Sequence, residues 1–356
     1  MTTLPDVRPV RSTGRRLGQT VRAAVDRYGL VVFLLALPVY FGAHDLIVHG
    51  NITPLIENLK DGISNGAIWA LVAIGYTLVY GIIELINFAH GDVFTMGSFV
   101  TAGLWGTLGL TLTTGTLGLV GGLLASLVVG MLACGTLNAL IERVAYRPLR
   151  NAPKLAPLIT AVGMSFILQN VGLLWRGGSQ QSVPDLIGAR KDLFVISGVH
   201  IYRSDLLSVG VTLPLVIALI LFLNRSRMGR AMRATAQDPE AARLMGINVD
   251  TTISLTFLMG GALAGAAGLV YALYQTTVWF FQGFTAGLIA FTAAVMGGIG
   301  NVQGAVLGGL IIGTIQQLSD FRIGAEWTTV IVFGYLVAIM VLRPRGLLGE
   351  ETREAG

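Results

Sequence analysis

The side chains best suited to hold a small solute gather at two interruptions of the apolar sequence. One reads Ile86-Asn87-Phe88-Ala89-His90-Gly91-Asp92, and the other Gly297-Gly298-Ile299-Gly300-Asn301. Non-helical backbone at membrane depth persists only where it is buried in protein or lines a cavity. Free N–H groups at a helix start could hold a carboxylate there, and free carbonyls an ammonium group. The alternative is that both segments are tight cytoplasmic turns between consecutive helices. The candidate pathway residues are Asn87, His90, Gly91, Asp92, Gly297, Gly298, Gly300 and Asn301.

Motifs for enzymatic chemistry are missing from the sequence. The lysines Lys60, Lys154 and Lys191 are followed by Asp, Leu and Asp, so none of them belongs to a phosphate-binding P-loop. Neither H-E-x-x-H nor G-x-S-x-G occurs, and His90 with Asp92 has no nucleophile nearby. We therefore expect no catalytic residue, no metal and no cofactor. The single cysteine, Cys134, cannot form an internal disulfide.

The segment Arg225 to Asp250 is a polar, arginine-rich insert between two long apolar stretches. Asp238 suits the N-cap of a short helix, Pro239 its first position, Glu240 its first turn and Gly246 its end. Ala241, Leu244 and Met245 then share one face. A helix of about two turns, roughly 10 Å long, cannot bury a core of its own and is expected to dock onto another protein. The candidate docking residues are Asp238, Glu240, Ala241, Ala242, Leu244, Met245 and Gly246.

Composition places these segments in a membrane protein. Of the 356 residues, 53% are hydrophobic and 12% are charged, and the mean hydropathy is +0.72. Soluble domains carry about 25% charged residues. The net charge of +5 does not indicate nucleic-acid binding, because the arginines cluster between apolar spans as they do in membrane topology.

The apolar segments predict an all-α, polytopic fold of about ten transmembrane helices. A span needs about 20 mostly apolar residues, fewer where it is broken or re-entrant, so the three short C-terminal segments leave eight or nine spans open. The ten candidates are Leu30–Val48, Ile63–Ile83, Val93–Leu110, Gly118–Leu140, Leu155–Trp175, Leu206–Asn224, Thr251–Gln275, Gly283–Gly298, Val302–Ser319 and Trp327–Leu342.

Lysine and arginine placement predicts the orientation. With the N-terminus inside, 18 of the 24 basic residues fall on the cytoplasmic side, a strong positive-inside bias. This gives a basic cytoplasmic extension over residues 1–28, a transmembrane domain over 29–349 and a cytoplasmic tail over 350–356. Within the domain, residues 225–250 are expected in the cytoplasm and residues 177–205 outside the cell membrane. In the outer segment, Leu193–Ile196 and Val199–Tyr202 predict a hairpin around Ser197-Gly198. The first apolar run could instead be a signal peptide, which would not change the later topology.

Apart from Asp45 near the end of the first segment, the ten segments contain no Asp, Glu, Lys or Arg, and Glu84 and Asp92 lie at their edges. Ion-coupled transporters usually need ionisable groups within the membrane. The pattern therefore favours a passive conduit that another subunit drives. Glycines four residues apart, such as Gly300, Gly304 and Gly308, indicate close helix packing, either static or sliding around a pathway.

Three long motifs resemble the permeases of branched-chain amino-acid ABC importers, of the LivH type. The resemblance covers about Leu55 to Gly349. Its motifs are Gly75-Tyr76-Thr77-Leu78-Val79-Tyr80-Gly81-Ile82-Ile83 with the following 86–92 segment, Glu142-Arg143-Val144-Ala145-Tyr146-Arg147-Pro148-Leu149-Arg150 leading into residues 161–170, and Phe291-Thr292-Ala293-Ala294-Val295-Met296-Gly297-Gly298-Ile299-Gly300.

The resemblance implies a heteromeric importer in the cell membrane. Its partners would be a second permease of the LivM type, two cytoplasmic ABC ATPases and an extracytoplasmic solute-binding protein, all around the lipid bilayer. Glu240-Ala241-Ala242 with Gly246 then matches the E-A-A-x-x-x-G core through which such permeases receive the ATPase stroke. The sequence departs from the family pattern at Thr256, where an isoleucine is usual, at Glu84, where a small or apolar residue is expected, and in the extra segment Arg8 to Val48.

We therefore expect a non-enzymatic permease subunit that moves a small zwitterion, most simply leucine, isoleucine or valine, into the cytoplasm. Urea, short amides and aromatic acids, which related permeases move, stay open as substrates. A self-sufficient channel for a small neutral solute is the alternative. The docking helix separates the two, because a channel has no need of one.

Overall fold

The computed structural model describes residues 13–150, 152–153 and 155–349. Helices dominate this part of the chain, and the strands form two small two-stranded antiparallel sheets, β1 with β4 and β2 with β3. The helices are α1 (Thr13–His49), α2 (Thr53–Ile83), α3 (Ala89–Thr107), α4 (Thr116–Ile141), α5 (Leu155–Arg176), α6 (Arg203–Arg225), α7 (Arg227–Gln237), α8 (Pro239–Leu244), α9 (Val249–Gln275), α10 (Gln282–Gly297), α11 (Val302–Arg322) and α12 (Ala325–Leu342). The other elements are a π-helical turn η1 (Glu142–Tyr146), a 3₁₀ turn η2 (Arg147–Leu149) and the strands β1 (Gln181–Ser182), β2 (Asp192–Ile196), β3 (Val199–Tyr202) and β4 (Thr277–Val278).

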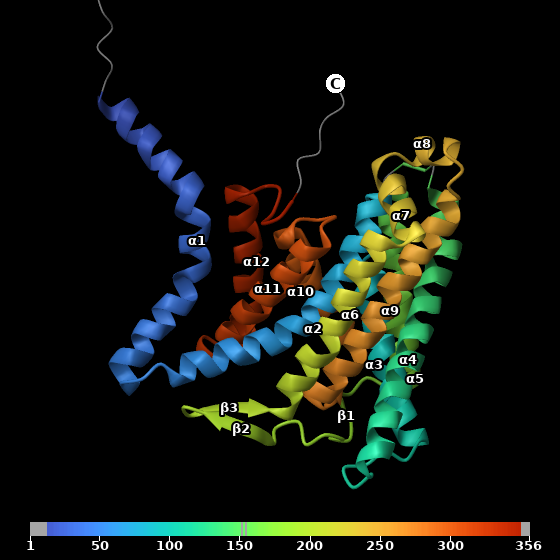
Figure 1. The fold of residues 1–356 in the computed structure, drawn as a ribbon, viewed down its shortest axis with the longest axis horizontal. Helices are drawn as coiled ribbons and strands as arrows, with labels where there is room; N and C mark the ends of the chain where they lie inside the picture. Colours follow the sequence, from blue (N-terminus) through green and yellow to red (C-terminus); the bar gives the residue numbers. More distant parts are fainter. Residues whose placement is uncertain (1–12, 151, 154, 350–356) are drawn as a thin grey trace, which may run out of the picture.

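The bundle has two distinct ends (Figure 1). Helices α7 and α8 lie at one end, here named the α8 end, and the β2–β3 hairpin lies at the opposite, hairpin end. The long helices run between them, with α2 and α9 in the middle of the packing and α4 and α5 along one side. The most apolar stretches of α2 and α9 are 83% and 72% buried, against 17% and 28% for α4 and α5. The outer helices therefore expose apolar faces, as surfaces against lipid or another membrane subunit do.

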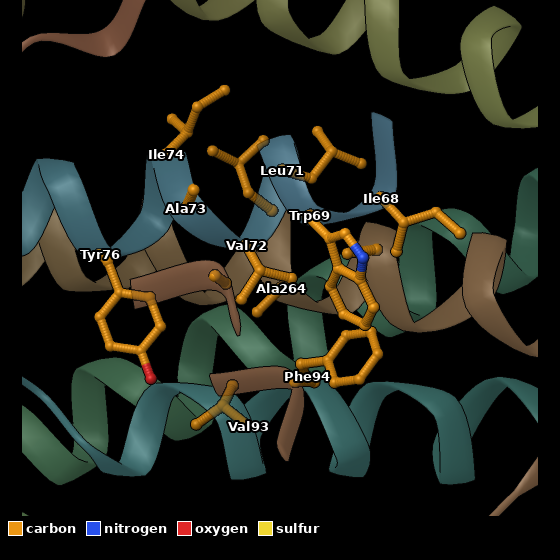
Figure 2. Close-up of a cluster of buried hydrophobic side chains, with 14 of the residues drawn as sticks. Ile68, Trp69, Leu71, Val72, Ala73, Ile74, Tyr76, Val93, Phe94 and Ala264 are labelled. Atoms are coloured by element: carbon orange, nitrogen blue, oxygen red, sulfur yellow. The ribbon is translucent and has the colours of Figure 1, made fainter. Parts of the chain in front are cut away.

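The centre of the bundle is a dense apolar cluster (Figure 2). Trp69 and Val72 of α2 point toward Phe94 and Val93 of α3. The rings of Trp69 and Phe94 lie 6.3 Å apart. Such offset aromatic contacts add to the free energy of burial alone, and they hold α2 against α3 at mid-height.

Small residues determine how closely the helices approach. A Cβ on Gly313 of α11 would overlap the backbone of Gly66 in α2, and a Cβ on Gly309 would lie 2.6 Å from the Cα of Ala70. Between α9 and α4, a Cβ on Gly265 would overlap the backbone of Gly130. The glycine spacing thus produces tight helix contacts, which lipid itself cannot drive by the hydrophobic effect.

Each of the ten predicted apolar segments forms a helix, but the predicted number of about ten spans is not confirmed. Seven helices among the described residues are long and apolar enough to cross a membrane, namely α1, α2, α4 with its continuation to Leu149, α5, α6, α9 and α12. Helix α10, at 16 residues, is shorter, and α3 and α11 also fall outside these seven. The glycines and buried polar side chains of α3, α10 and α11 lower the mean hydropathy of these helices. Such residues suit helices that pack against protein rather than lipid.

The predicted hairpin in the 177–205 segment is present as β2 and β3. Ser197 and Gly198 form its turn with φ values of +50° and +84°, the left-handed pair that a two-residue turn requires. Lys60 of α2 donates to the backbone oxygen of His200 at 2.6 Å and to Asp205 of α6 at 2.7 Å. This cation ties the hairpin to the start of two long helices.

Helix α1 lies apart from the bundle over much of its length (Figure 1). It is longer than the predicted span and contains Pro38. Near its end, the guanidinium of Arg322 donates two hydrogen bonds, at 2.8 and 2.6 Å, to the buried carboxylate of Asp45. The helix is therefore fastened to the end of α11 by a bidentate ion pair.

Candidate functional site

The predicted docking helix forms as α8, with the signals that the sequence indicated. The carboxylate of Asp238 accepts hydrogen bonds from the backbone N–H groups of Glu240 and Ala241, both at 2.9 Å. Gly246 has a φ of +82° and ends the segment. Only glycine adopts that conformation without steric cost. Because α8 ends abruptly, the chain continues after a short turn into α9, whose N-cap is Asn248.

The two faces of α8 differ in exposure. Leu244 and Met245 are 89% and 83% exposed, whereas Ala242 is 3% exposed. Ala242 therefore faces the bundle and anchors the helix, while the apolar knob of Ala241, Leu244 and Met245 points away from it. Large apolar side chains that exposed, next to charged residues, are typical of a surface that docks onto another protein.

Helix α7 connects α8 to the bundle. Ser226 caps it by accepting a hydrogen bond from Gly229 at 2.8 Å. Met232 and Thr235 are buried, and α7 packs against α2, α6 and α9. Helix α7 thus connects α8 to three long helices.

A network of charged side chains holds the start of α9. Arg150 donates to both Glu142 and Asp250, and Arg147 donates to Asp250 at 2.6 Å. The second oxygen of Glu142, whose side chain is fully buried, accepts from Ser254 at 2.6 Å. The motif from Glu142 to Arg150 therefore clamps the beginning of the helix that follows α8.

A cavity of about 320 Å³ lies beside α7. Its wall combines α2, α6, α7 and α9 with the turn between α10 and α11, and it includes Gly300 and Asn301 from the predicted pathway. Thr77, Asn224, Arg233 and Gln303 make it polar. Thr256, where the sequence departs from the family motif, also lines it, with its hydroxyl donating to the backbone oxygen of Thr252 at 2.9 Å. The structure thus brings part of the predicted pathway against the predicted docking segment.

The first interruption, 84–88, is a short connection between α2 and α3, and its neighbours are buried. The hydroxyl of Tyr146 donates to Asn87 at 2.8 Å, and Asn87 donates to Asn138 at 3.2 Å. Asn138 in turn donates to the backbone oxygen of Phe257 at 2.7 Å. These bonds join the connection between α2 and α3 to α4, η1 and α9, so Asn87 is part of the packing between helices.

His90, Gly91 and Asp92 begin α3 inside the protein. His90 is fully buried with its ring 4.8 Å from that of Tyr76. A Cβ on Gly91 would overlap the backbone of Gly283 in α10. Ser165 of α5 donates to Asp92 at 2.5 Å. None of the three lines the cavity beside α7 or the cavity at the hairpin end described below, so their role in a pathway stays a prediction.

The second interruption, 298–301, is the turn between α10 and α11. Gly298 and Gly300 have φ values of +109° and +93°. Asn301 caps α11 by accepting from Gly304 at 3.0 Å and donates to the backbone oxygen of Leu348 at 2.9 Å. Gly297 lets α10 and α11 touch, because a Cβ there would overlap Gly304. This interruption divides into packing residues, Gly297 and Gly298, and cavity residues, Gly300 and Asn301.

Another cavity, of about 210 Å³, lies at the hairpin end between α2, α9, α10 and α11. Its wall includes Trp69, Tyr271, Gln275, Gln282 and Gln316. Sequence patterns do not predict this group, because the five residues come from four separate helices. The signal present in the sequence was the occurrence of glutamine within apolar segments.

Among the described residues, seven helices are long and apolar enough to cross a bilayer, and polar cavities lie toward both ends of the bundle, features that define a multi-pass membrane protein. The family described as branched-chain amino acid transport system / permease component matches residues 58–341. The chain belongs to this family.

Individual relatives agree with this assignment. The chain is 40% identical over 302 residues to the high-affinity branched-chain amino acid transport system permease protein BraD of Pseudomonas aeruginosa, covering 83% of this chain and 95% of that one. It is 39% identical over 300 residues to LivH of Escherichia coli, with the same coverage. A probable LivH of Methanocaldococcus jannaschii is 28% identical over 313 residues, covering 83% of this chain and 93% of that protein. Among solved structures, PsaBC from Streptococcus pneumoniae in complex with Fab matches 86% of this chain and 97% of its own at 13% identity and a TM-score of 0.42.

Proposed function

We propose that this chain is one transmembrane subunit of an ABC importer that moves branched-chain amino acids into the cytoplasm. One observation carries the proposal. The α7–α8 unit presents Leu244 and Met245 outward, at 89% and 83% exposure, while α7 forms a wall of the cavity that contains Gly300 and Asn301. A surface that binds a partner and a wall that lines a cavity thus belong to one short, well-anchored unit.

The proposed partners follow from the exposed surfaces. Two cytoplasmic ABC ATPases would bind α8 of this chain and of a second permease of the LivM type. The exposed apolar faces of α4 and α5 suit lipid or that second permease. A solute-binding protein would dock at the hairpin end. No surface in this arrangement is assigned to nucleic acid.

The orientation that fits these partners puts the α8 end in the cytoplasm. Arg143, Arg147, Arg225, Arg227 and Arg230 all lie in or beside the elements at that end, which agrees with the positive-inside bias. Residues 1–28 and 350–356 would then be cytoplasmic flanks of a transmembrane domain over 29–349. Residues 225–250 would be the cytoplasmic coupling loop and 177–205 the extracytoplasmic loop.

Coupling would run from α8 to the cavity. A partner that binds Leu244 and Met245 would move α8 as a unit, because Asp238 caps this helix and Ala242 anchors it to the bundle. The Arg150–Asp250 pair holds the start of α9 in place. The displacement therefore falls on α7 and changes the cavity wall at Arg233 and Asn301.

The coupling role is tested with Leu244→Glu combined with Met245→Glu. Burying each apolar side chain in a partner contributes about 1.5–3 kcal/mol, so the pair should weaken ATPase association by about 100-fold or more. The matched control is Leu117→Glu, an equally exposed residue, at 90%, on the first turn of α4. The control should copurify with the ATPases normally. Unchanged ATPase copurification and uptake in the double variant would remove the coupling role.

The transport role is tested by uptake into liposomes that contain the chain with its permease, ATPase and binding-protein partners. Leucine, isoleucine and valine should enter only with ATP and the binding protein, and urea or an aromatic acid should not compete. Flux of any of these solutes through the purified chain alone, without nucleotide, would instead identify a self-sufficient channel.

A further inference from the structure

The cavity at the hairpin end carries an inference that rests on the proposed function. We infer that it is a low-affinity transit site, which holds the transported amino acid after it leaves the binding protein. We name it the amide–aromatic pocket and define it by Trp69, Tyr271, Gln275, Gln282, Thr285 and Gln316. The inference goes beyond the proposed function because it assigns recognition of the substrate to specific residues of the permease.

The wall of the amide–aromatic pocket is polar yet uncharged. Its twelve described lining residues include four glutamines and two threonines but no Asp, Glu, Lys or Arg. Amide and hydroxyl groups can donate to a carboxylate and accept from an ammonium group. A zwitterion with zero net charge therefore finds partners for both ends, whereas an ion would lose its hydration without a counter-charge.

Part of the wall is held rigidly. Gln316 accepts a hydrogen bond from the indole of Trp69 at 2.7 Å and another from Asn65 at 3.3 Å. Gln282 donates to Ser98 at 3.0 Å and accepts from the backbone of Trp279 at 2.9 Å. These bonds orient two of the amides before a ligand arrives, which lowers the entropic cost of binding.

Another part of the wall consists of polar side chains that can form further hydrogen bonds. Within the part of the chain that the structure describes, the hydroxyl of Tyr271 and the side chains of Gln275 and Thr285 have no hydrogen-bond partner. Gln275 and Thr285 are exposed, so the pocket opens to the surface. These three groups are therefore free to bind an ammonium or carboxylate that enters.

The remaining surface suits an aliphatic side chain. Trp69, Val278, Ala286 and Ile289 are buried apolar residues of the wall, and the ring of Trp69 lies 6.2 Å from that of Tyr271. The volume of about 210 Å³ is below the roughly 300–1,000 Å³ of pockets for drug-sized ligands. The occupant is thus a small molecule with an apolar branch. Because the wall carries no charge, this molecule binds weakly enough to leave again, as passage through a membrane requires.

The amide–aromatic pocket is also joined to the segment where a binding protein would dock. The indole of Trp279 donates to the backbone oxygen of Gly178 at 2.9 Å. The backbone of Val183 donates to that of Thr276 at 3.0 Å, and β1 pairs with β4. The 177–205 segment thus lies against the mouth of the pocket, in position to receive a solute.

The test uses the complete transporter in liposomes, with its ATPases and binding protein, and radiolabelled leucine as the probe. Thr285→Trp fills the pocket from an exposed position and should lower leucine uptake about tenfold or more, because steric exclusion removes binding of even a small ligand. Phe284→Trp, on the adjacent and likewise exposed position of α10, is the control and should retain uptake. Gln275→Leu, which removes a free amide without adding bulk, should reduce uptake several-fold.

A second measurement is independent of folding defects. The single native cysteine, Cys134, is buried, so Thr285→Cys can be labelled selectively with a charged methanethiosulfonate reagent added at the hairpin end. Labelling should block leucine uptake, and excess leucine should slow the labelling. Leu193→Cys on the exposed hairpin strand should be labelled at a rate that excess leucine does not change.

The outcomes separate the two proposals. If the unmodified transporter takes up leucine but Thr285→Trp does so at the same rate, or if leucine does not protect Thr285→Cys, the pocket assignment is overturned and the importer function stands. If the unmodified complex with all partners takes up no branched-chain amino acid, the proposed function fails and the pocket inference fails with it.

Discussion

Arg150 and Asp250 are 100 positions apart in the sequence, and their side chains form an ion pair at the start of α9. The same guanidinium binds Glu142, which is fully buried. Arg150 therefore links the η1–η2 turns to Asp250 in the first turn of α9. This relationship gives the Glu142–Arg150 motif a structural role, which is to hold the end of the proposed coupling loop in place.

Arg150→Ala should destabilise the protein strongly. It leaves the buried carboxylate of Glu142 without its cation, a change that typically costs about 3–5 kcal/mol. Arg147→Ala is the matched control, because the Arg147–Asp250 pair is 41% exposed on both sides and such pairs contribute about 0–1 kcal/mol. Thermal unfolding in detergent, followed by size-exclusion fluorescence, compares the two. Equal melting temperatures for the two variants would contradict the clamp.

Gly313→Val should prevent α2 and α11 from packing. The added side chain would overlap the backbone of Gly66, and a collision between two helix backbones cannot be relieved by a side-chain rotation. Gly334→Val in α12 is the control, since a Cβ there meets nothing within 4 Å. The expected result is loss of folded protein for Gly313→Val and near-normal yield for Gly334→Val. Monodisperse, active Gly313→Val protein would show that the α2–α11 contact is placed wrongly.

Asn87→Leu should lower stability and uptake together. It removes the acceptor of the Tyr146 hydroxyl and the donor to Asn138, and each buried polar group left without a partner costs about 1–3 kcal/mol. Tyr146→Phe deletes only one hydroxyl of the same chain of bonds and should cost less. Uptake measured beside the melting temperature distinguishes the roles. A stable Asn87→Leu protein with impaired uptake would instead support a direct pathway role for Asn87.

The Asp45–Arg322 pair predicts how the protein tolerates loss of α1. The family match begins at residue 58, so a chain without residues 1–50 should still form the bundle. Its Arg322, now 12% exposed, would lose its partner, which we expect to lower the melting temperature. Replacing Arg322 by Gln in the shortened chain should recover part of that loss. If the full-length Arg322→Gln protein is as stable as the unaltered one, the ion pair does not hold α1.

Local signals in the sequence determined much of this protein. The apolar runs, the Ser197-Gly198 turn and the Asp238, Pro239 and Gly246 signals predicted helices, a hairpin and a capped docking helix, because each depends on residues close together in the chain. Whether a pathway candidate packs between helices or lines a cavity does not depend on residues close to it in the chain. Asn87, His90 and Asp92 are packed among helices α4, α5 and α9 or against Tyr76, whereas Gly300 and Asn301 line a cavity. Nothing in the neighbouring sequence distinguishes these two outcomes.

The tertiary structure alone decided which distant side chains share a cavity or an ion pair. Trp69, Tyr271, Gln282 and Gln316 meet because α2, α9, α10 and α11 cross at that height. Glycines such as Gly66 and Gly313 set how closely two of these helices approach. Periodicity reports which residues are apolar and how long an element is. The crossing heights and rotations of helices arise from contacts between separate elements, and these appear only when the chain is packed.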